Sequence, residues 1–108
     1  MLEISGFKRD RQGVWIEKSP DATLDYTLNW AGVLPPDQLI ITSTWEIESI
    51  PDDAAPLAQV TKSFISPYTT IVLTGGTIGK MYTVKNIITT ETYTEAREFR
   101  VLIKARSI

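Results

Sequence analysis

Residues 22–30 read ATLDYTLNW and alternate between apolar and polar side chains. The apolar set comprises Ala22, Leu24, Tyr26, Leu28 and Trp30, and the polar set comprises Thr23, Asp25, Thr27 and Asn29. Successive side chains of a β-strand point to opposite faces. The pattern therefore predicts a strand with one face in a core and the other in water.

Three further stretches repeat this alternation. Residues 39–48 set Leu39, Ile41, Ser43, Trp45 and Ile47 against Ile40, Thr42, Thr44, Glu46 and Glu48. In residues 97–106, Arg97, Phe99, Val101, Ile103 and Ala105 alternate with Glu98, Arg100, Leu102, Lys104 and Arg106, and the second set is predicted to face solvent. Residues 81–90 place Tyr82, Val84, Asn86 and Ile88 on one side. With shorter runs at 14–17, 58–65 and 69–74, the chain is predicted to form about seven strands.

Composition also favours strands over helices. Ile, Val and Thr supply 33 of the 108 residues, and β-branched side chains suit a pleated sheet. No window shows the period of an amphipathic helix, and turn signals occur at 19–21, 35–37, 51–53, 66–67 and 75–76. The predicted fold is all-β, an immunoglobulin-like β-sandwich of about seven antiparallel strands, with a small barrel as the alternative.

The chain is predicted to divide into a short arm and one domain. Residues 1–12 lack regular alternation and contain the basic cluster Lys8, Arg9 and Arg11. They are predicted to be an N-terminal arm, either disordered or ordered by a partner subunit. Residues 13–108 are predicted to be a single immunoglobulin-like β-sandwich domain, a size that one core can stabilise.

Three aromatic residues are predicted to belong to the core. Trp45 lies on the third predicted strand, where such sandwiches often bury a tryptophan. Tyr82 begins the sixth strand, and its hydroxyl is expected to hydrogen-bond to upstream backbone as a tyrosine corner. Trp30 is assigned to the core rather than to ligand stacking.

Histidine and cysteine are both absent, which removes most of the common catalytic chemistry. The chain has no imidazole base, thiolate nucleophile, zinc-thiolate site or disulfide. We therefore predict no catalytic residue, no metal site, no cofactor and no enzymatic activity.

Charge is distributed unevenly along the sequence. Residues 1–61 hold ten acidic and four basic residues, whereas residues 62–108 hold three acidic and seven basic ones. The isoelectric point of about 5.0 argues against nucleic acid as the partner. No stretch has the roughly 18 apolar residues that span a bilayer. The opposite charges of the two halves are interpreted as ordinary solvated strand faces, with contacts between neighbouring protein subunits as the alternative.

A glycine-rich run, Gly75–Lys80, superficially resembles a phosphate loop. Thr74 occupies the position of the first glycine, and Met81 replaces the hydroxyl that binds Mg²⁺. A strand-joining turn that uses the positive φ of glycine is the preferred interpretation.

Acidic residues offer only weak chemical signals. Glu46 and Glu48 lie about 7 Å apart on one strand face, a spacing that glycosidases use but that solvated strands also show. Asp52 and Asp53 lack the spaced acids of a calcium loop. Asp25 is expected to tie a loop by accepting backbone N–H bonds.

Several residues occur in an order that resembles a known family. They are the run KSPDATLDY at 18–26, Trp30, Ser43-Thr44-Trp45, LTGGT at 73–77 with Gly79, Tyr82 and Val84, and Ile88-Thr89-Thr90. The set is similar to small bacteriophage and prophage virion proteins of the fibre-tail adaptor kind over residues 18–106. The segment 51–58 departs from that pattern as an insertion where members turn more tightly.

The resemblance implies an immunoglobulin-like, non-enzymatic assembly module of the tail, fibre or head-tail region. Other virion proteins are the implied partners, with self-association left open, and nucleic acid, membranes and small-molecule substrates are not expected. The implied location is the virion, after synthesis in the host bacterial cytoplasm. No partner-binding residue is assigned. The alternative is a recognition module for cell-surface glycan or protein, for which Trp15 and Tyr68 are the aromatic candidates.

Overall fold

A computed structural model describes residues 8–11 and 13–105 of the chain. Over these residues it contains eight β-strands and no helix, so no helix there could span a bilayer. The strands are β1 (Lys8–Asp10), β2 (Gly13–Lys18), β3 (Leu24–Asn29), β4 (Thr42–Ile47), β5 (Ala58–Ile65), β6 (Tyr68–Thr74), β7 (Met81–Thr89) and β8 (Thr94–Ile103). The all-β prediction is confirmed.

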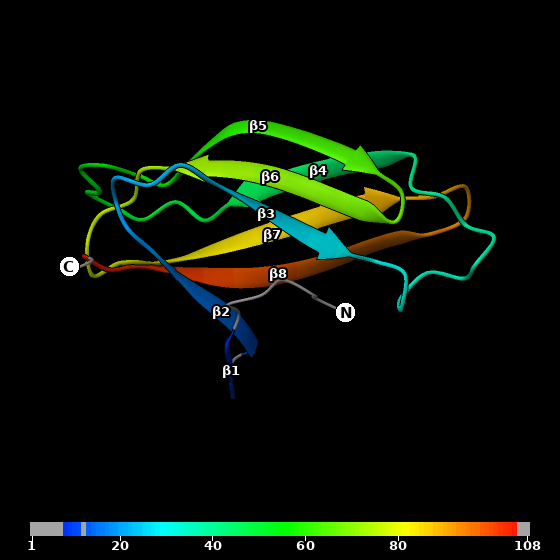
Figure 1. Ribbon diagram of the computed structural model, residues 1–108, viewed down its shortest axis with the longest axis horizontal. Helices are drawn as coiled ribbons and strands as arrows, with labels where there is room; N and C mark the ends of the chain where they lie inside the picture. The colour runs from blue at the N-terminus through cyan, green and yellow to red at the C-terminus, as the bar shows by residue number, and fades with distance from the viewer. Residues whose placement is uncertain (1–7, 12, 106–108) are drawn as a thin grey trace.

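Two sheets pack face to face and form a β-sandwich (Figure 1). The five-stranded sheet has the order β1-β2-β8-β7-β4, and the three-stranded sheet has the order β3-β6-β5. Neighbouring strands are antiparallel except β2 and β8, which run parallel. This pair differs from the antiparallel prediction because its strands are far apart in sequence, so no hairpin fixes their relative direction. The immunoglobulin-like subtype stays a prediction.

Side chains of both sheets meet in one core, as the alternation predicts for most positions, although Leu24 on the predicted core face of residues 22–30 is 40% exposed. The buried apolar residues are Tyr26, Leu28, Trp30, Leu34, Ile40, Trp45, Leu57, Ile71, Leu73, Tyr82, Val84, Ile88, Phe99, Val101 and Ile103. The β7 pattern holds throughout, because Tyr82, Val84, Asn86 and Ile88 are all buried. In residues 97–106 it holds only for Phe99, Val101 and Ile103, since Arg97 and Ala105 of the same predicted face are exposed. The rings of Trp45 and Phe99 pack edge to face, with their centroids 6.4 Å apart.

The prediction that Leu39 and Ile41 lie on the same face as Trp45, with Ile40 on the opposite face, is wrong. Leu39 and Ile41 are exposed, at 69% and 53%, whereas Ile40 between them is buried. The strand ladder starts only at Thr42. Before it, the Ile40 N–H donates to Ser66 Oγ at 3.1 Å rather than to a neighbouring strand. The backbone therefore enters β4 from an irregular segment, and the inward and outward positions are exchanged.

The structure has one strand more than the seven predicted. This additional strand is β1, and it lies within the predicted N-terminal arm. It pairs antiparallel with β2, and Lys8 lies opposite Trp15 with its ammonium 4.9 Å from the ring centre. The Arg100 guanidinium of β8 forms an ion pair with Asp10. Part of the predicted arm thus joins a sheet of its own chain. Positions 1–7 and 12 lie outside the described residues, and the division into 1–12 and 13–108 stays a prediction.

Candidate protein-interaction surface

Tyr82 holds one end of the sandwich closed. Its hydroxyl accepts a hydrogen bond from the Thr77 backbone N–H at 3.1 Å, which confirms the predicted bond to upstream backbone. The same hydroxyl donates to the carboxylate of Asp53, and the Thr77 hydroxyl donates to that carboxylate as well. The corner therefore fastens the β4–β5 connection to the β6–β7 turn.

The segment 51–58, which departs from the family pattern, is part of this closed end. The Gly76 N–H donates to the Ala55 carbonyl at 2.9 Å, and the Ala55 N–H donates to Thr77 Oγ1 at 3.2 Å. Leu57 is buried in the core. The described residues contain no group of three or more side chains able to hold a metal ion. The Asp53 carboxylate serves as a structural acceptor, a role that sequence reasoning missed because its partners lie more than 20 residues downstream.

Lowering the pH should reduce the free energy of unfolding of the wild-type protein more than that of the variant Asp53→Asn. The hydrogen bonds from Thr77 and then Tyr82 hold the pKa of Asp53 below its usual range. The unfolded chain therefore takes up this proton at a higher pH than the folded chain does. The stabilisation is fully present above about pH 4, the ordinary Asp value, and is lost as the pH falls through the lower folded pKa.

Urea unfolding at pH 7 and pH 3 measures this effect. Asp52→Asn is the matched control, because Asp52 is the exposed neighbour and its positive φ of 58° also suits asparagine. The control should lose stability between the two pH values as wild type does, whereas Asp53→Asn should lose less. Equal losses in all three proteins would contradict the role assigned to Asp53.

The glycine-rich run Gly75–Lys80 forms a strand-joining turn, as predicted. Gly75, Gly76 and Gly79 have φ angles of 78°, 105° and 87°, which side-chain-bearing residues rarely adopt. The strand β7 follows directly at Met81, so no helix N-terminus is present to hold a phosphate.

A buried lysine adds to the same end of the fold. Lys18 is fully buried, and its ammonium donates to the Ser19 carbonyl at 2.9 Å and to the Gly75 carbonyl at 2.8 Å. Burial lowers the pKa of Lys18, and the nearby Asp21 opposes this shift. The only sequence signal for this residue is its place at the start of the run that carries the family resemblance.

Polar residues in the interior link the two sheets. Asn86 on β7 accepts hydrogen bonds at Oδ1 from Trp30 Nε1 at 3.1 Å and from Thr69 Oγ1 at 2.7 Å. Its Nδ2 donates to Ser43 Oγ at 3.0 Å and to the Thr44 carbonyl at 3.1 Å. Trp30 is 1% exposed, as its predicted core role requires. These buried polar groups are satisfied by one another, and they define a structural link rather than a ligand site.

The acidic candidates on the strands do not converge. Glu46 is exposed on β4 in register with Lys85, and Glu48 is exposed just after the strand ends. Asp25 is exposed on β3, and its carboxylate accepts no backbone N–H from the described residues, contrary to prediction. The β3 backbone is already paired with β6, so no loop N–H lies beside this side chain.

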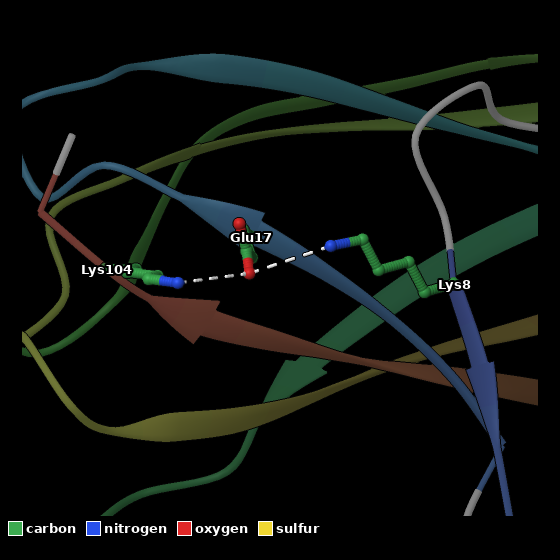
Figure 2. Close-up of polar contacts among 3 residues, drawn as sticks. All are labelled: Lys8, Glu17 and Lys104. Carbon is green, nitrogen blue, oxygen red and sulfur yellow. Dashed lines mark ion pairs between the residues drawn. The ribbon is translucent and has the colours of Figure 1, made fainter. Parts of the chain in front are cut away.

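Charges on the outer face of the five-stranded sheet neutralise one another. Glu17 lies between two lysines, with its Oε2 atom 3.7 Å from Lys8 Nζ and 3.9 Å from Lys104 Nζ (Figure 2). The glycan-binding alternative needs neighbouring exposed rings, but Trp15 lies on β2 of this sheet and Tyr68 on β6 of the other. The two rings therefore do not form one platform.

The described surface contains a groove between β4 and β5, which we call the seam. It is lined by Ile41, Thr42, Ser43, Lys62, Ser63 and Phe64. At its outer end it continues through Ile41 and Leu39 into two hollows among the loops that follow β3, β5 and β7. Figure 1 shows these loops together at one end of the sandwich, on the right in this view. Exposed apolar side chains thus gather at the seam and at this end, the opposite end to Tyr82.

These features describe a class of protein: an all-β sandwich whose buried polar groups serve the fold and which exposes apolar side chains at one edge and one end, as protein-binding modules do. Residues 18–103 match the family model Gp77, described as podophage GP4 fiber-tail adaptor protein gp77. The chain belongs to this family, as its resemblance predicted. The family is one of phage structural adaptors rather than enzymes. The search of curated proteins finds no match.

Proposed function

We propose that this chain is a non-catalytic adaptor that joins tail and fibre components of a phage virion through protein contacts. The observation that carries the proposal is the family match, which begins at buried Lys18 and ends at buried Ile103. The match therefore covers the whole three-stranded sheet and strands β8, β7 and β4 of the five-stranded sheet, but not β1 or most of β2. The partners are other virion proteins, and the adaptor acts by shape and surface chemistry with no cofactor. Self-association stays a prediction.

Particle composition tests this function. We expect mass spectrometry to detect the chain in density-purified particles of the phage or prophage that encodes it. Deletion of its gene should give particles that retain tails but lack fibres, and a plasmid copy should restore the fibres. Purified particles that contain tail and fibre proteins but none of this chain would overturn the proposal.

A further inference from the structure

We propose that the seam between β4 and β5 binds an extended segment of another virion protein that carries a carboxylate among apolar side chains. This inference rests on the adaptor function proposed above and identifies the surface and the partner chemistry. Three features of the described residues support it: free strand edges, an exposed apolar lining and one cation without a carboxylate partner.

Both walls of the seam are sheet edges. β4 ends the five-stranded sheet and β5 ends the three-stranded sheet (Figure 1). A free edge presents backbone N–H and C=O groups that an added strand can pair with. All eight residues of β5 are exposed, an unusual state for a strand of this length in a small sandwich. The edge is therefore available for strand addition over the regular part of β5, from Thr61 to Ile65.

The side of β5 that faces β4 is only partly covered. Lys62 and Phe64 lie in register with Ile71 and Thr69 of β6, whose side chains are fully buried. The inward side of the sheet thus becomes solvent-exposed where it reaches β5, and Phe64 is 39% exposed. Ile41 on the opposite wall is 53% exposed. An extended segment in the seam would bury both side chains at alternate positions along its length.

The charge of the seam determines what the segment must carry. Lys62 is the only charged residue in its lining, and its ammonium donates to the Ser43 carbonyl at 3.1 Å. No carboxylate of the described residues forms an ion pair with Lys62. Lys8 and Lys104, by contrast, both contact Glu17 (Figure 2). A carboxylate from the partner would complement this cation and fix the register of the added strand.

A second copy of the chain fits this edge poorly. β5 reads AQVTKSFI, so Lys62 is its only charge, and antiparallel pairing of two β5 strands would bring together two cations without an acid. An inward-pointing charge protects a sheet edge from pairing with a copy that carries the same charge, whereas a carboxylate on a different partner would neutralise it. The partner is therefore a different chain.

Photo-cross-linking inside the virion tests the occupant. A benzophenone amino acid replaces Phe64 in a plasmid copy supplied to the phage whose own gene is deleted, and the particles are purified and irradiated. Trp15 is the matched control position, because it is an aromatic residue on the outer face of the other sheet. We expect position 64, but not position 15, to cross-link to another virion protein, at an extended segment that contains Asp or Glu.

Charge reversal gives a second and independent measurement. Lys62→Glu should lower the number of copies per particle at least tenfold, whereas Lys62→Arg should keep the wild-type number. Lys104→Glu is the matched control, because it makes the same charge change on the other sheet at the cost of one exposed ion pair. Thermal unfolding of the purified variants establishes that Lys62→Glu still folds.

The outcomes separate this inference from the function on which it rests. If particles contain the chain but position 64 cross-links only to a second copy or to nothing, the proposed occupant is wrong and the adaptor function stands. Full incorporation of folded Lys62→Glu would also overturn the role of the seam. If wild-type particles contain none of the chain, the adaptor function itself fails.

Discussion

The free energy of unfolding of the variant Gly76→Ala should be about 4 kcal/mol lower than that of wild type. This decrease would lower the unfolding temperature by roughly 20 °C. Gly76 has a φ of 105°, so alanine would be strained there whatever the available space. An added Cβ would also lie 2.5 Å from Cδ1 and 2.6 Å from Cγ1 of Ile103. Ile103 is 1% exposed in the core and has little room to move. Backbone strain and steric overlap therefore act together.

Two further variants separate these causes. Gly79→Ala carries similar strain, with a φ of 87°, but its added Cβ would have no heavy atom within 4 Å. We expect it to cost about 1–2 kcal/mol. Ile103→Ala removes the overlapping atoms, so the double variant Gly76→Ala with Ile103→Ala should cost less than the two single changes added together. A strictly additive double variant, measured by urea unfolding, would show that the overlap is absent.

The sequence predicts what depends on local pattern. The alternation from Met81 to Thr90 placed Asn86 on the same side as Tyr82, whose core role was predicted, and both residues are buried in the structure. The glycine-rich run was correctly predicted to be a turn, because positive φ is a local property of the backbone. The phase of residues 39–41 could not be predicted, since it depends on contacts of Ile40 and Ile41 with segments 26 and 48 residues away.

The candidate surface could not be predicted from the sequence pattern, because it also depends on contacts between segments that are distant in sequence. The segment 58–65 was predicted to be a strand with the correct bounds, yet nothing in its sequence indicates that it is a sheet edge. The seam exists only because β5 comes to lie beside β4, which is in the other sheet. Lys18 is a similar case: a lysine at the end of a strand is normally solvated, and its burial depends on the distant Gly75 carbonyl.

The variant Asn86→Leu should lose about 3–5 kcal/mol of stability, although leucine is similar in size and more apolar. Asn86 is fully buried and makes four hydrogen bonds that connect β7 to β4, to β6 and to Trp30. Leucine would leave the Thr69 hydroxyl, the Ser43 hydroxyl and the Thr44 carbonyl without this partner. Desolvated groups that lose their partners cost more than the apolar replacement gains.

The control for Asn86→Leu is a hydrogen bond of similar length that water can reach. Thr27 Oγ1 and Thr70 Oγ1 lie 2.9 Å apart on the outer face of the three-stranded sheet. Thr27→Val removes this bond where solvent can replace it, so the cost should stay below about 1 kcal/mol. Urea unfolding of both variants measures the difference. If Asn86→Leu proved as stable as Thr27→Val, the interior network would be dispensable, and apolar packing alone would hold the two sheets together.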